Sequence, residues 1–174
     1  MFVDHTLESA PEGSKEALRR TQKGFGFVPV AMRRLAESPV LLAAFDDGTR
    51  HFAASSLTPR QQEVVILTVA RLNECHLCVA IHGRMLARQG HRALVAPLTA
   101  GEATGDPALD ALVRFVEQLM ACRGQVSDAE LQMFFDAGFQ QRHALDVVVG
   151  VAAYTLSTFA NRLTRAPVDP QLQP

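Results

Sequence analysis

The strongest constraint on the fold is residues 57–73, which read LTPRQQEVVILTVARLN. Thr58 is a good helix N-cap, Pro59 suits the first helical position, and Gln61 completes a capping box. From Val64 to Leu72 the segment is apolar on nearly every side, which is typical of a helix buried against several neighbours. A parallel strand is the competing interpretation of VVILTV, but the capping signal and the length favour a helix.

Similar signals predict helices along the rest of the chain, and almost no segment has the pattern of a strand. Ser38 with Pro39 is a start signal, and Asn73 is expected to cap the helix that follows it. In the last helix, the small residue Gly150 would allow close packing. Besides 57–73, helices are predicted over residues 14–24, 30–37, 39–55, 74–90, 106–122, 127–137 and 140–162, with a loop over 99–105.

Length and composition suit one all-α domain. The chain has 174 residues, of which 48% are hydrophobic, and a domain of about 150 residues buries roughly two-thirds of the surface of its unfolded chain. No internal repeat or low-complexity stretch divides the sequence. The prediction is a single domain over residues 1–174, with a helical core at about 14–163 and a C-terminal tail over 164–174.

Charge and hydropathy exclude several kinds of partner. With 18 acidic and 17 basic side chains, the chain has no basic field for nucleic acid. The best apolar run, Val147–Leu156, is far shorter than the roughly 18 residues that a membrane span needs, so no membrane is expected. The N-terminus has acids where a secretory signal would be basic, and the three cysteines do not suit a disulfide scaffold. The expected location is the cytoplasm.

Cys75, Cys78 and His82 form the pattern Cys-x-x-Cys-x-x-x-His, the most informative in the chain. On a helix these spacings put all three side chains on one face, where thiols and imidazole can meet. Near a helix N-terminus the dipole favours thiolate over thiol, and a nearby imidazole can take the proton. Thiolate is the reactive form of cysteine, so one sulfur could attack a substrate and the other resolve the product as a disulfide.

Two other interpretations of the cysteines stay open. Cysteine is among the most buried residue types, so Cys75 and Cys78 could be inert core thiols. Zinc is the sharper rival, because the two thiolates and His82 would supply three tetrahedral ligands. Cys122 or His76 would then have to supply the fourth. The chain would in that case be a non-enzymatic metal-binding or interaction module, although zinc-binding Cys-x-x-Cys pairs usually sit on loops.

Glu63 lies on the buried helix that precedes the cysteine pair. A carboxylate that points into the core is costly unless it meets a partner such as His82, whose imidazole it could orient. The simpler alternative is an exposed Glu63 in the first helical turn, paired with Arg60. Its register with the cysteine pair favours the functional interpretation.

With these residues the sequence resembles the alkylhydroperoxidase D-like (AhpD-like) proteins of the carboxymuconolactone decarboxylase superfamily, in their peroxidase-related branch. The shared motif is Glu63, Cys75, Cys78 and His82, in the order Glu-x11-Cys-x-x-Cys-x-x-x-His. The flanks FGFVPVAMRRLAESPVLLAAF, LTPRQQEVVILTVARLNECHLCVAIH and FANRLTRAPVDP also resemble this branch, so that the similarity covers most of the chain.

The resemblance implies an all-helical subunit that forms homo-oligomers, often trimers or hexamers, and a thiol-dependent peroxidase without haem, metal or other cofactor. By that similarity Cys78 would be the peroxidatic nucleophile and Cys75 the resolving partner. His82 and Glu63 would form the proton relay that activates Cys78. Peroxide would give a sulfenic acid on Cys78, which Cys75 would convert to a disulfide. The implied partners are a hydroperoxide substrate and a dithiol reductant, a thioredoxin-like or lipoyl protein.

One residue departs from the family pattern. In the best-known members a second histidine immediately precedes the second cysteine, whereas here Leu77 has that place and His76 comes one residue earlier. One residue is a rotation of about 100° on a helix, so His76 is not expected to take the same role. The departure bears on the strength of the peroxidase activity. A decarboxylase-like activity is the other family alternative, but the superfamily's decarboxylases do not use a Cys-x-x-Cys pair.

The remaining polar candidates are expected to be structural. Cys122 is expected to fill core space, and Tyr154 to be a packed residue with a satisfied hydroxyl. Asn161 and Arg162 could line a subunit contact, and some phenylalanines could wall a pocket over the thiols. Four histidines have no cysteine or carboxylate at ligand spacing and are expected on the surface: His5, His51, His91 and His143.

Overall fold

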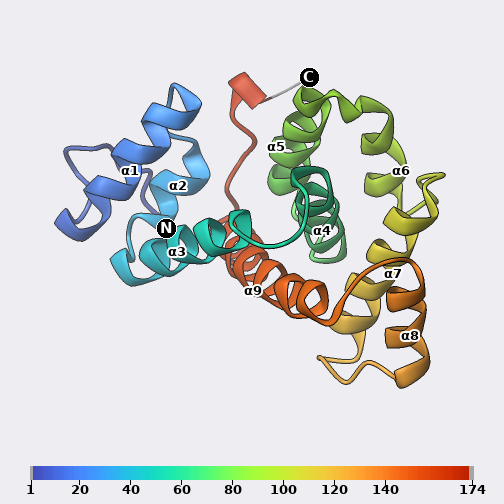
Figure 1. Cartoon of the computed structure of the whole chain (residues 1–174). Coiled ribbons are helices and arrows are strands. Elements are labelled where there is room, and N and C mark those ends of the chain that lie inside the picture. The colour runs from blue at the N-terminus through green and yellow to red at the C-terminus, as the bar shows by residue number, and fades with distance from the viewer. Residues whose placement is uncertain (1, 173–174) are drawn as a thin grey trace.

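The computed structural model describes residues 2–172, which form nine α-helices and no strand (Figure 1). The predicted all-α class is therefore confirmed. The helices are α1 (Glu12–Phe25), α2 (Val30–Leu35), α3 (Pro39–Ala53), α4 (Pro59–Leu72), α5 (His76–Leu86), α6 (Val95–Ala100), α7 (Pro107–Ala121), α8 (Asp128–Asp136) and α9 (Gln141–Thr164). Short π- and 3₁₀-helical turns cover Ala87–His91, Arg92–Leu94 and Pro170–Leu172.

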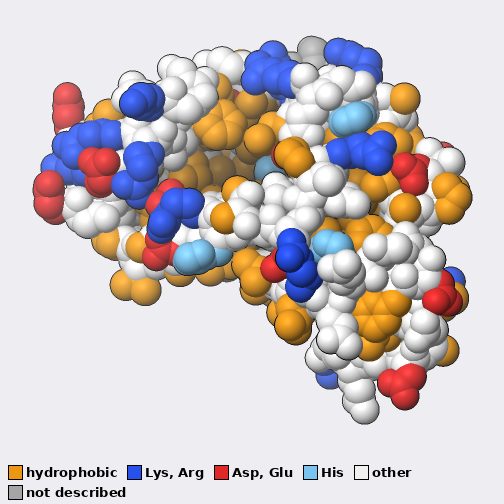
Figure 2. Space-filling model, in the orientation of Figure 1, with side chains coloured by type: hydrophobic (Ala, Val, Ile, Leu, Met, Phe, Trp, Pro, Cys, Tyr) orange, Lys and Arg blue, Asp and Glu red, His pale blue; other side chains and the backbone are white. Residues whose placement is uncertain are grey.

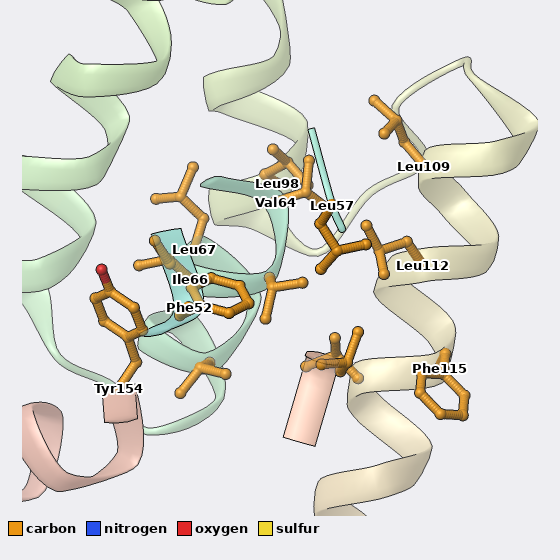
Figure 3. Packing of buried hydrophobic residues seen from close by; sticks show 14 of the residues in the cluster. Phe52, Leu57, Val64, Ile66, Leu67, Leu98, Leu109, Leu112, Phe115 and Tyr154 are labelled. Carbon is orange, nitrogen blue, oxygen red and sulfur yellow. The ribbon is translucent and has the colours of Figure 1, made fainter. Parts of the chain in front are cut away.

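The centre of the fold is α4, which packs against α5, α7 and α9. Its first turn has the predicted capping box, because Thr58 and Gln61 each accept the backbone N–H of the other. Val64, Val65 and Leu67 are completely buried, and such side chains contribute roughly 1.5–3 kcal/mol each when they leave water. Figure 3 shows this helix among side chains of α3, α6, α7 and α9. The nearly all-apolar segment is thus a core helix, as predicted.

A close crossing of α3 and α9 fixes the position of the long last helix. A Cβ on Gly150 would stand 2.6 Å from Cε2 of Phe52, which is far inside the contact distance of two carbons. Phe52 is buried, and its ring meets Tyr154 edge-on with the centroids 6.1 Å apart. Glycine at position 150 is therefore required by the packing of α3 on α9.

By length and composition alone, α9 is the one helix of residues 2–172 that could cross a membrane. Its most apolar 18-residue window has a mean hydropathy of 1.3, and 39% of that window is buried inside the protein. The same test is passed by core helices of soluble proteins, and α9 packs along α3 and α4. One side of α9 is thus committed to the core, and the other side carries exposed apolar residues.

The C-terminal segment after α9 closes the gap between α2 and α5 (Figure 1). The Asp169 carboxylate accepts the backbone N–H of Val30 at the start of α2, at 3.1 Å. On the other side, Nη1 of Arg84 in α5 donates to the carbonyl of Gln171 at 2.7 Å. Leu172 is buried beside Cys75 and Leu77. The tail therefore forms part of the wall around the cysteine pair.

Several sequence predictions need correction. Cys122 is exposed at the end of α7, because that helix ends there and the chain turns outward. His5 is buried rather than on the surface, because its Nε2 is 2.6 Å from the Glu37 carboxylate. The predicted loop over 99–105 begins two residues too early, since α6 runs to Ala100.

Candidate active site

The cysteine pair begins α5, directly after a tight junction with α4. Asn73 ends α4 rather than capping α5, and its amide donates to Oγ1 of Thr158 at 2.9 Å. Glu74 has a left-handed φ of 51°, and the N–H of Cys75 donates back to the carbonyl of Ala70 at 2.8 Å. Cys75 itself is the N-cap of α5. The predicted helix start was thus wrong by two residues, because the chain reverses at Glu74 before the helix begins.

The two sulfurs lie together in the interior. Sγ of Cys75 and Sγ of Cys78 are 3.1 Å apart, and both residues are buried free cysteines. Cys75 precedes the first helical turn and Cys78 is its third residue, so the helix dipole favours negative charge on the pair. The distance permits both a sulfur–sulfur hydrogen bond and closure to a disulfide after a small movement.

The surroundings of the two thiols give them different pKa values. The hydrogen bond with Cys78 lowers the pKa of Cys75 to about 6 against the effect of burial, and the backbone N–H of Cys78 and the Asn161 amide act in the same direction. The contact with Cys75, together with burial, raises the pKa of Cys78. In the reduced pair, therefore, Cys75 carries the thiolate and Cys78 holds the shared proton.

Glu63 and His82 form the second part of the site. Glu63 on α4 is buried, and its Oε2 accepts from Nδ1 of His82 on α5 at 2.9 Å. The predicted meeting of these side chains is confirmed, and the exposed alternative for Glu63 is wrong. The His82 ring also packs edge-on against Tyr154, with the centroids 5.1 Å apart. Two neighbours thus fix the orientation of the imidazole.

The imidazole does not bond directly to the thiols. Within residues 2–172 no hydrogen bond joins His82 to Cys75 or Cys78. Instead, His82 and Cys78 border the same cavity, which we call the inner cavity. A molecule in this cavity can therefore contact both the imidazole and Cys78.

The inner cavity has a volume of about 330 Å³ and lies between α1, α2, α3, α5 and α9. Figure 2 shows a hollow with hydrophobic side chains on its floor between the α1–α2 side and α5. Tyr154 is a packed residue, as predicted, since its ring meets Phe45, Phe52 and His82, and burial raises the pKa of its hydroxyl. The apolar and aromatic lining comprises Phe25, Met32, Phe45, Ile81, Met85 and Tyr154.

Asn161 on α9 completes the site, and sequence reasoning missed it. Its Nδ2 donates to Sγ of Cys78 at 3.4 Å, while its Oδ1 is buried without a hydrogen-bond partner among the described residues. The side chain is buried rather than on a subunit contact. A polar residue in the flank FANRL was the available signal, but only the packing of α9 on α5 brings it to the sulfurs.

A second hollow, which we call the outer cavity, lies on the other side of the pair. It has a volume of about 710 Å³ and lies between the start of α5, the end of α9 and the C-terminal tail. Cys75 borders it, whereas Cys78 does not. His76 is exposed on its rim, away from the Glu63–His82 pair, as its position one residue early predicts.

Comparisons with known proteins agree with this arrangement. The sequence model of the carboxymuconolactone decarboxylase family matches residues 37–118. Among solved structures, the chain is similar to an "alkylhydroperoxidase AhpD core", an uncharacterized peroxidase-related protein from Ralstonia eutropha JMP134. The TM-score is 0.88 at 20% identity, over 98% of this chain and 93% of that chain. Residues 37–118 thus match the carboxymuconolactone decarboxylase family, and the described chain has the AhpD-like fold.

Two further comparisons show the range of this fold. An uncharacterized peroxidase-related protein from Silicibacter sp. TM1040 has a TM-score of 0.82 at 18% identity, over 98% of this chain and 92% of its own. The debrominase Bmp8 has a TM-score of 0.76 at 12% identity, over 92% of this chain and 88% of its own. No curated protein was found to match. At these identities the solved structures establish the AhpD-like fold and leave the activity to be argued from the site.

All four predicted site residues lie inside the matched segment, as the pairs Cys75–Cys78 and Glu63–His82, whereas Asn161 lies beyond it. The residues considered as zinc ligands, by contrast, do not gather around one point. Within residues 2–172 no three His, Cys, Asp or Glu side chains are arranged to hold a metal ion. Cys122 lies at the end of α7, and His82 is bonded to Glu63. The arrangement therefore suits sulfur redox chemistry better than metal binding.

Proposed function

We propose that the protein is an oxidoreductase, a thiol-dependent peroxidase that reduces organic hydroperoxides with Cys78 and Cys75. The observation that carries the proposal is a pair of sulfurs 3.1 Å apart, one of which borders an apolar cavity together with the Glu63–His82 pair. Such a cavity suits the hydrocarbon part of an organic hydroperoxide. The peroxidase-related names of two structural neighbours support the same reaction class.

In the first step, the shared proton passes from Cys78 to Cys75, so that the thiolate charge is on Cys78. The Asn161 amide, which donates to this sulfur, stabilises the charge. The thiolate attacks the terminal oxygen of the hydroperoxide, and the S–O bond forms as the O–O bond breaks. The leaving alkoxide takes a proton from the His82 imidazolium, which Glu63 holds in place. The products are an alcohol and a sulfenic acid on Cys78.

In the second step, Cys75 attacks the sulfenic acid of Cys78. The S–S bond forms, the hydroxyl group leaves with the proton of Cys75 as water, and the pair becomes a disulfide. A dithiol then supplies two electrons and two protons, which restore the thiol–thiolate pair and the His82 imidazolium. We propose a thioredoxin-like or lipoyl protein as this donor, a homo-oligomeric assembly such as a trimer or hexamer, and a cytoplasmic location.

A stopped-flow experiment with cumene hydroperoxide tests the proposal. All proteins carry Cys122→Ser, because the exposed Cys122 would otherwise consume oxidant. The parent is expected to lose two thiols per peroxide, and Cys75→Ser to stop at a sulfenic acid that dimedone traps. Cys78→Ser is expected to leave the peroxide unreduced. Equal rates for Cys78→Ser and the parent would end the proposal.

The alternative function, that of a metal-binding or interaction module, is tested with the same purified protein. Metal analysis of the purified chain would give stoichiometric zinc if that function were correct. The peroxidase proposal instead expects a disulfide that forms with peroxide and opens with a dithiol. A decarboxylase-like activity would be independent of both cysteines, so it would survive the double substitution of Cys75 and Cys78 by serine.

A further inference from the structure

We infer that the two sulfurs are reached from opposite sides: the hydroperoxide meets Cys78 from the inner cavity, and an anionic dithiol reductant meets Cys75 from the outer cavity. The inference rests on the proposed function for the roles of the two reactants. Its structural basis is independent of turnover, because it concerns which sulfur borders which cavity.

The two cavities meet at the cysteine pair and share one lining residue. Cys78 borders the inner cavity and Cys75 the outer one, and among the described residues only Asn161 borders both. Asn161 is buried, and its unpartnered Oδ1 leaves an acceptor for a proton-bearing reactant. Asn161 therefore acts as a partition between two binding spaces.

The linings of the cavities differ in chemistry. The inner cavity is mostly apolar, and the Arg20–Asp46 pair beside it is an ion pair with atoms 2.7 Å apart, so it offers no free charge. On the outer cavity, Arg162 is paired with Glu74 at 2.9 Å, while the neighbouring Arg165 makes no salt bridge within residues 2–172. The outer cavity thus has an excess of positive charge beside a sulfur, which suits a thiol reagent with a carboxylate.

Disulfide reduction through the outer cavity balances. A thiolate of the donor attacks Sγ of Cys75, the S–S bond breaks, and Cys78 leaves as a thiolate that accepts the Asn161 N–H. The second thiol of the donor then attacks the donor's first sulfur in the mixed disulfide, and Cys75 is released. The donor ends as a disulfide, and the enzyme has gained two electrons and the proton of the donor's second thiol, which the reduced pair then shares.

Reaction with charged and neutral disulfide reagents tests the inference. On the Cys122→Ser background, Cys78→Ser leaves Cys75 as the single cysteine and Cys75→Ser leaves Cys78. The probes are the dianion 5,5′-dithiobis(2-nitrobenzoate) and the neutral 2,2′-dithiodipyridine. We expect the dianion to react at least about tenfold faster with Cys75 than with Cys78, because steering by local charge changes rates by 10-fold or more. The neutral reagent is expected to show a smaller preference.

Arg165→Glu provides the charge test, with Arg165→Lys as the matched control that keeps the charge. Arg165→Glu should slow the dianion at Cys75 by about tenfold and leave the neutral reagent within about twofold. Arg165→Lys should leave both rates nearly unchanged. Arg165 is exposed, so the variants are expected to fold, and melting curves check this.

Equal rates of the dianion at the two single cysteines, or no effect of Arg165→Glu, would overturn the inference. These rates are measured without peroxide, so they do not depend on peroxidase activity. A chain that lacks peroxidase activity but keeps the Cys75 preference would therefore refute the proposed function and leave the two-sided access standing.

Discussion

At the scale of single residues, the mutual contact of the two thiols sets which of them ionises first. The contact with Cys78, backbone N–H groups and the Asn161 amide lower the pKa of Cys75, whereas the contact with Cys75 and burial raise the pKa of Cys78. No imidazole is bonded to either sulfur within the described chain. In the proposed mechanism Cys75 is therefore the base for Cys78, and the Glu63–His82 pair serves the leaving oxygen.

The ionisation of Cys75 predicts a pH dependence. Thiolate is the form that reacts, so the rate of alkylation of Cys75 by iodoacetamide should rise with pH. The midpoint is expected near the pKa of about 6. Cys78→Ala removes the hydrogen bond and should move the midpoint toward the free-cysteine value of about 8.5. Mass spectrometry of labelled peptides on the Cys122→Ser background measures both curves, and a parental midpoint near 8.5 would contradict the assignment.

Among the site residues, those within one local segment were the predictable ones. Glu63, Cys75, Cys78 and His82 lie on two consecutive helices, so their spacing along the chain indicates their meeting. Asn161 comes from α9, 83 positions beyond Cys78, and no local pattern encodes that register. Cys122 and His5 were misplaced for a related reason. Burial of a single side chain depends on what packs against it from elsewhere, which residue type alone does not specify.

At the scale of helices, start signals were reliable because capping is local. Thr58, Ser38 and Asp106 all accept backbone N–H groups at the predicted helix starts. The start of α5 was missed, because it depends on the left-handed Glu74, a conformation that non-glycine residues seldom adopt. Local chemistry thus specified the helices, whereas the junction that aligns the sulfurs is set by tertiary packing.

The crossing of α3 and α9 gives a stability prediction. Gly150→Ala would place a Cβ 2.6 Å from the Phe52 ring, so we expect a loss of about 1–3 kcal/mol in the free energy of unfolding. Gly24→Ala is the control, because a Cβ there meets nothing within 4 Å and should stabilise α1 by up to about 1 kcal/mol. Urea denaturation measures both. Equal free energies of unfolding for the two variants would show that α3 and α9 leave room for a Cβ at position 150, against the prediction.

At the scale of the whole molecule, α9 has two different faces. Its buried side carries Asn161 and Tyr154 to the site. Its other side presents apolar residues at helical spacing, with Leu145, Phe159 and Leu163 each at least 60% exposed. A contiguous apolar stripe on a surface is typical of an interface. We expect a second copy of the chain to cover it, because an interface with two-fold symmetry places the same helix face against itself.

Association of copies through this face is therefore predicted. Phe159→Asp should shift the protein toward monomers in sedimentation velocity, because it buries a charge in the interface. Met133→Asp is the control, since Met133 is an exposed apolar residue on α8, away from the stripe. A parent that sediments as a monomer would refute the predicted assembly, and equal effects of both substitutions would refute its location.

The partition formed by Asn161 has a consequence for how the protein would meet a sudden rise in oxidant. A hydroperoxide bound in the inner cavity would leave the outer cavity open, so a high peroxide concentration would not block the donor that reduces the disulfide. Oxidation and reduction of the pair would still alternate, but the rate of reduction would depend on the donor concentration alone.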